Sequence, residues 1–183
     1  MRKGNLSRAM MALSLVIGVL LLAPLASSLP TGIGGSSIQT AGCNCHNSVA
    51  DSSVAANIEG FPEEYNASET YELTISFDGG PSQPGNINLG GFNLWASEGA
   101  FTPTDGLTSL WAGSVNEVVH TEAGNDYTSW VVDWTAPESG KEVDFILHVN
   151  SVNGDGLQTG QLDQWNRATF TIQSSFGLVG EVI

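Results

Sequence analysis

The chain has 183 residues, of which 19 are acidic and only five are basic, giving a formal net charge of −14. Three of the basic residues lie among the first eight, and every acidic residue lies beyond residue 50. A surface this acidic repels phosphate backbones and anionic membranes, so nucleic acid is excluded as a partner. The length suits one domain with a sizeable core.

Residues 1–28 are typical of a secretory signal peptide. Arg2, Lys3 and Arg8 form its basic end, an almost unbroken apolar run follows, and small residues precede a cleavage point near Ser28. The apolar run is shorter than the roughly 20 residues that a membrane span needs. An uncleaved N-terminal anchor is the alternative, and it would be the only contact with a membrane. In both cases we expect an extracytoplasmic protein, secreted or held at the cell surface.

Residues 29–41 are rich in glycine, serine and threonine and show no hydrophobic period, so they predict a flexible leader. The body of the chain, residues 42–175, is expected to form one domain, followed by a C-terminal tail over residues 176–183.

Short segments of alternating apolar and polar residues recur through this body. The expected strands are residues 71–77, 92–97, 118–121, 130–134, 143–149 and 168–172, with a long loop over 150–166. In the segment 143–149 the odd-numbered residues share the inward face, so His148 faces away from them. Glycine and proline turns separate the segments. The pattern predicts an all-β domain, a single antiparallel β-sandwich.

The run Gly42-Cys43-Asn44-Cys45-His46 holds both cysteines of the chain. The Cα atoms of such a pair lie about 6.5 to 7 Å apart in an extended chain, so a disulfide would be strained and easily reduced. Thiolates beside an imidazole suit a copper or zinc ion. The haem c attachment motif, Cys-X-X-Cys-His, has one more spacer residue, but Cys45-His46 could still hold a haem through a single thioether.

The other two histidines are candidate ligands for the same centre. His120 ends a short apolar run and is the first choice for a distal ligand, and His148 is the second. An ordinary solvated or hydrogen-bonded histidine stays open for both. The candidate cofactor-binding residues are Cys43, Cys45, His46 and His120, and the candidate metal ligands are His46, His120 and His148.

The loop from Val152 to Asn166 concentrates oxygen ligands and glycines, as calcium loops do, but it lacks the EF-hand register. Calcium is therefore a third cofactor candidate, and an ordinary Asn/Gly/Asp turn is the alternative. The sequence contains neither Gly-x-Ser-x-Gly nor His-Glu-x-x-His, and it predicts no enzymatic activity.

Several motifs also follow one another in a characteristic order. They are the Gly-Cys-x-Cys-His run, Gly60-Phe61-Pro62, Gly91-Phe92-Asn93-Leu94, His120-Thr121, Trp134-Thr135-Ala136-Pro137 and Val152-Asn153-Gly154-Asp155-Gly156. This order resembles the reeler-like "choice-of-anchor" surface domains of bacteria and archaea, over residues 41–173. The resemblance implies a reeler or immunoglobulin-like sandwich. Many members carry Cys-x-x-Cys-His and a later His-Thr, which implies a haem with two axial histidines, here His46 and His120.

Two functions stay open at this point. The first is an exported, non-catalytic surface domain whose Cys-x-Cys-His centre serves electron transfer or metal handling with a redox partner. The second is an adhesion or structural module that binds a surface ligand without any cofactor, in which Cys43 and Cys45 only pin the leader. The first function requires the imidazole of His120 or His148 close to the Cys/His turn.

Overall fold

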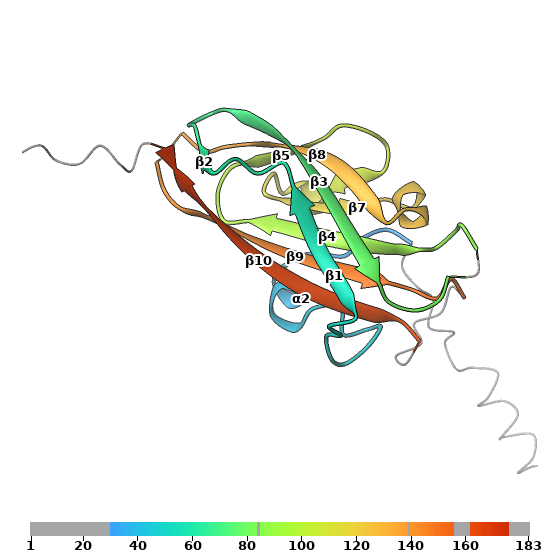
Figure 1. Cartoon of the computed structure of the whole chain (residues 1–183). Coiled ribbons are helices and arrows are strands. Elements are labelled where there is room, and N and C mark those ends of the chain that lie inside the picture. The colour runs from blue at the N-terminus through green and yellow to red at the C-terminus, as the bar shows by residue number, and fades with distance from the viewer. Residues whose placement is uncertain (1–29, 84, 139, 156–161, 176–183) are drawn as a thin grey trace, which may run out of the picture.

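The computed structural model describes residues 30–83, 85–138, 140–155 and 162–175. The predicted signal peptide and C-terminal tail lie outside these residues. The described part of the chain forms two packed β-sheets with one short helix and two 3-10 turns (Figure 1). Within it, no helix is long and apolar enough to cross a membrane.

One sheet has four strands and the other has six. The first, in spatial order, consists of β1 (Val54–Glu59), β3 (Thr70–Gly79), β8 (Ser129–Thr135) and β5 (Ala100–Pro103). The second consists of β2 (Glu64–Tyr65), β10 (Gln164–Ser174), β9 (Val143–Ser151), β4 (Gly90–Ala96), β7 (Glu117–His120) and β6 (Thr108–Leu110). Neighbours pair antiparallel except for the short parallel pair of β2 and β10. The predicted all-β sandwich is confirmed.

The core lies between the sheets and is built from alternate residues of the long strands. Phe145 and Leu147 of β9 are buried, and so are Trp130 and Trp134 of β8 in the facing sheet. The rings of Trp134 and Phe145 meet edge to face with centroids 5.0 Å apart, a favoured aromatic geometry. Burying each such side chain contributes roughly 1.5–3 kcal/mol. The inward faces predicted for these two strands are thus confirmed.

The loop expected over residues 150–166 is shorter in the structure. Strand β9 continues to Ser151, and β10 begins at Gln164. The backbone pairing of the two strands extends past Val149, the last apolar residue of β9, and places Asn150 opposite Trp165. Strand β1 was not predicted either. Its sequence, Val-Ala-Ala-Asn-Ile-Glu, buries only Val54 fully and therefore shows no clear period of two.

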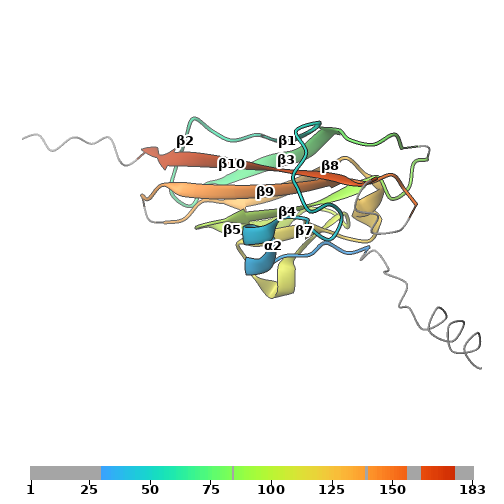
Figure 2. The same ribbon diagram turned by 90° about the horizontal axis from the view of Figure 1, so that it is seen from below.

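Residues 30–47, which we call the strap, lie on the outer face of the six-stranded sheet, away from β1 and β3 (Figure 2). They include most of the segment that was expected to be a flexible leader. The structure instead shows a short helix there, α2 (Ser36–Ala41), with Ile38 as its buried residue. The strap therefore adds a third, partial layer to the sandwich.

Candidate functional site

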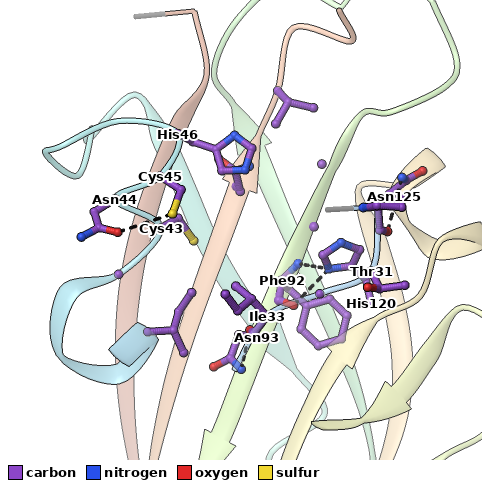
Figure 3. A pocket seen from close by; sticks show the side chains of 18 of the residues that line it. Thr31, Ile33, Cys43, Asn44, Cys45, His46, Phe92, Asn93, His120 and Asn125 are labelled. Atoms are coloured by element: carbon purple, nitrogen blue, oxygen red, sulfur yellow. Dashed lines mark hydrogen bonds between the residues drawn. The ribbon is translucent and has the colours of Figure 1, made fainter. Parts of the chain in front are cut away.

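A cavity of about 480 Å³ opens between the strap and one end of the six-stranded sheet (Figure 3). Cys43, Cys45 and His46 line it from the strap, and His120 lines it from the end of β7. The structure therefore brings to one pocket all four residues that the sequence nominated for cofactor binding.

The first half of the strap is hydrogen-bonded to β7. The amide of Gly32 donates to the carbonyl oxygen of His120 at 2.9 Å. The amide of Gly35 donates to Oε1 of Glu117 at 2.7 Å, and Nδ2 of Asn93 donates to the same oxygen at 2.8 Å. Glu117 is only 4% exposed, so this carboxylate is a buried anchor for the strap. It places the strap residues directly beside His120.

The second half of the strap is held by Trp165 near the start of β10. The Trp165 Nε1–H donates to the carbonyl oxygen of Asn47 at 2.8 Å. Gly42 packs on the same ring, and a Cβ at this position would lie 2.1 Å from it. Gly42 also has φ of +66°, a conformation that favours glycine. Glycine is therefore required where the Cys/His turn begins.

A buried carboxylate holds the imidazole of His46. Nδ1 of His46 and Oδ2 of Asp163 lie 2.8 Å apart, and Asp163 has no solvent exposure. The other oxygen, Oδ1, accepts a hydrogen bond from the amide of Asn153 at 3.1 Å. Both carboxylate oxygens are thus occupied, and the orientation of His46 is tied to the loop before β10. Sequence reasoning missed this role and placed Asp163 in a calcium-like loop.

The two cysteines are free thiols with different surroundings. Burial and, to a smaller extent, the charge of Cys45 together raise the pKa of Cys43 to about 12. Cys43 therefore stays a neutral thiol, which is a poor nucleophile. Cys45 is exposed. The strained disulfide considered from the sequence is not formed.

His120 is placed by the close approach of β4. A Cβ at Gly91 would lie 2.2 Å from Cε1 of the imidazole, so only glycine leaves room for the ring. Nδ1 of His120 lies 3.1 Å from the amide nitrogen and 3.2 Å from the carbonyl oxygen of Phe92, and either tautomer finds a partner there. Burial lowers the pKa of His120, and the charge of His46 lowers it further. A neutral imidazole is the form that binds metals.

His148 is not among the residues that line the pocket. It faces away from the core between the sheets, as predicted, but it has no solvent exposure. On this outer face the ring of Trp165 from β10 lies 6.2 Å from that of His148. The strap lies on the same face of the sheet (Figure 2). Among the described residues, neither ring nitrogen of His148 has a hydrogen-bond partner.

The described residues contain no group of three or more His, Cys, Asp or Glu side chains positioned to hold a metal ion. Residues 156–161 of the predicted calcium loop lie outside the described part of the chain. The geometry thus offers a roomy pocket with two imidazoles and two thiols, not a compact ion cage.

No family model matches the sequence, and no curated protein matches it. Solved structures do match. The reeler domain of human F-spondin has 19% identity and a TM-score of 0.44, and the match covers 68% of this chain and 91% of that chain. The Reelin-N domain of F-spondin has 19% identity and a TM-score of 0.43, covering 68% and 88%. AggA, the major subunit of aggregative adherence fimbriae type I from Escherichia coli, has 12% identity and a TM-score of 0.40, covering 69% and 96%. The likeness is one of fold. It includes reeler domains, the fold that the resemblance of the sequence motifs implies.

Proposed function

We propose that the chain is an exported surface module that holds a haem under the strap and serves electron transfer without catalysis. One observation carries this proposal. The Cys/His turn and His120, which come from distant parts of the sequence, line the same pocket. The predicted signal peptide supports export, and the acidic surface suits an extracytoplasmic location.

The residues present fit a haem better than they fit a single ion. Haem iron takes axial ligands from side chains such as neutral imidazole, and the pocket has two of these in His46 and His120. Its volume lies within the roughly 300–1,000 Å³ that cofactor and small-molecule sites occupy. Phe92 and Ile33 give the lining an apolar part. When bound, a haem supplies one-electron chemistry, while the protein holds it and limits its contact with water. A copper or zinc ion is the alternative cofactor, for which the described residues hold no three side chains in position.

Cys45 is the residue that we propose for covalent attachment. It directly precedes His46, as the second cysteine does in the haem c motif, and its thiol is exposed. A thioether forms when the S–H bond adds across a vinyl group, with the hydrogen going to carbon, so no oxidant is needed. Cys43 is the poorer candidate because it is less exposed than Cys45 and its pKa is raised.

The second candidate is an adhesion or structural surface module without a cofactor. The packing of the strap favours it, because Glu117 and Trp165 hold the strap in place through contacts that need no bound group. On this view the pocket is a by-product of strap packing, and Cys43 and Cys45 are structural.

The test is to express the full chain together with a cytochrome c maturation system and to measure its absorption spectrum. We expect a Soret band, and a haem stain that survives denaturation. Cys45→Ser should remove the stain that survives denaturation, while His120→Gln should change the spectrum of the iron. His148→Gln is the matched control, because its imidazole lies outside the pocket, and it should leave the spectrum unchanged.

Colourless protein, obtained with the maturation system active and the cysteines reduced, would contradict the haem proposal. Copper and zinc should then be measured in the same protein by elemental analysis. If neither metal is present, the cofactor-free surface module is the remaining candidate.

A further inference from the structure

We infer that Asp163 is a positioning residue that fixes the tautomer of His46, so that Nε2 is the nitrogen available to a ligand in the pocket. The inference rests on the proposed function for its purpose, but its structural part can be tested without any cofactor. Asp163 was not among the residues nominated from the sequence.

The first step concerns the hydrogen between the two side chains. An ionised carboxylate only accepts hydrogen bonds. Oδ2 of Asp163 lies 2.8 Å from Nδ1 of His46, so Nδ1 carries the hydrogen. In a neutral imidazole the other nitrogen, Nε2, then keeps its lone pair. Carboxylates that orient ligand histidines in this way also raise the basicity of the ligand nitrogen.

The second step concerns the rigidity of Asp163 itself. Its side chain has no solvent exposure, and Oδ1 accepts the amide hydrogen of Asn153 at 3.1 Å. Two residues further along, Trp165 binds the carbonyl oxygen of Asn47, directly after His46. Asp163 therefore holds the imidazole of His46, and Trp165 holds the backbone of the residue that follows it. Precise positions of this kind are expected where a side chain must present one particular atom.

The third step predicts the effect of Asp163→Asn. The amide oxygen of the new side chain can still accept from Asn153, which turns its NH2 group toward Nδ1 of His46. An NH2 group donates and cannot accept, so Nδ1 would lose its hydrogen and the hydrogen would move to Nε2. His46 would then present an N–H group to the pocket in place of a lone pair, and it could no longer bind iron.

The experiment measures the 15N chemical shifts of the His46 ring nitrogens in the full chain without cofactor, at a pH where the imidazole is neutral. We expect the Nδ1–H tautomer in the unchanged protein and the Nε2–H tautomer in Asp163→Asn. Asp51→Asn is the matched control. Asp51 accepts a hydrogen bond from Gln164, next to Asp163, and within the described residues it makes no hydrogen bond to His46. This variant removes an equal charge nearby and should keep the Nδ1–H tautomer.

An Nε2–H tautomer in the unchanged protein would overturn the inference, even if Asp163→Asn fails to fold. An unchanged tautomer in a folded Asp163→Asn protein would overturn it as well. The second readout is haem affinity, which should fall roughly 10- to 100-fold in Asp163→Asn and stay unchanged in Asp51→Asn. If the unchanged protein binds no haem, the proposed function fails. The tautomer measurement, which needs no haem, then still tests whether Asp163 fixes the orientation of the His46 hydrogen.

Discussion

His148 is the residue whose burial has the clearest energetic consequence. His148 has no solvent exposure, and no described residue hydrogen-bonds to either ring nitrogen. The β9–β10 register pairs it with Arg167. Removal from water disfavours the charged imidazolium, and the positive charge of Arg167 disfavours it further. Together they lower the pKa of His148 to about 4. The native protein therefore keeps this side chain neutral well below the usual histidine pKa of about 6.5.

This shift predicts a stability that depends on pH. Between about pH 6.5 and pH 4 the unfolded chain binds a proton at residue 148 that the native chain does not bind. The free energy of unfolding should therefore fall as the pH falls through this window, by on the order of 3 kcal/mol from this residue. The lowered pKa of His120 acts in the same direction. Urea unfolding at about pH 7.5 and about pH 4.5 measures the loss.

The control for this prediction is His148→Leu, which removes the titrating group and keeps an apolar side chain of moderate size. Carboxylates titrate in the same window in both proteins, so the difference between the two pH dependences is the quantity of interest. The variant should lose less stability than the unchanged protein. Equal losses would show that His148 does not stay neutral in the native state.

At the scale of elements, the contact between the strap and β10 depends on Gly42. Alanine at this position would have an unfavourable positive φ, and its Cβ would overlap the Trp165 ring. We expect Gly42→Ala to lift the Cys/His turn from β10 and to speed amide hydrogen exchange over residues 36–47. With φ of +66° and ψ of −159°, Gly42 occupies a backbone region that is essentially restricted to glycine, and another residue there costs about 1–3 kcal/mol.

Gly113→Ala separates the two effects of that substitution. Gly113 also has a positive φ, of +77°, but nothing lies within 4 Å of a Cβ placed there. Gly113→Ala should also lose backbone stability, but it should leave amide exchange over residues 42–47, which pack against Trp165, unchanged. If both variants exchange equally in the strap, the Trp165 contact does not hold the turn.

Elements with a strong local period were predictable, and contacts between distant elements were not. The alternation in β8 and β9 indicated which residues enter the core. The Cys-x-Cys-His run and His120 supplied four of the residues that line the pocket. Asp163 lies 117 residues from His46 in sequence, so no local pattern could link them. The same reason explains His148. The alternation of residues in β9 predicts that the His148 side chain faces away from the core. Its burial depends on the strap, which is distant from β9 in the sequence.

At the scale of the whole molecule, charge is the dominant feature. Only Lys141 and Arg167 provide Lys or Arg charge beyond the predicted signal peptide, against 19 carboxylates. In the described residues the one carboxylate paired with either of them is Glu98, 3.6 Å from Lys141. Exposed pairs of this kind contribute little. Most acidic side chains therefore repel one another across the surface, which destabilises the compact state.

Salt should consequently stabilise this protein. The screening length falls from about 30 Å at 0.01 M ionic strength to about 3 Å at 1 M, which removes most of the repulsion between exposed carboxylates. We expect Tm to rise with sodium chloride across this range, by about 2–4 °C for each kcal/mol of repulsion that is screened. Calcium chloride at matched ionic strength distinguishes screening from binding. An equal rise in both salts indicates screening alone, whereas a larger rise in calcium would support a calcium site in the loop before β10. A Tm that stays constant or falls as sodium chloride increases would show that self-repulsion does not limit the stability of the fold.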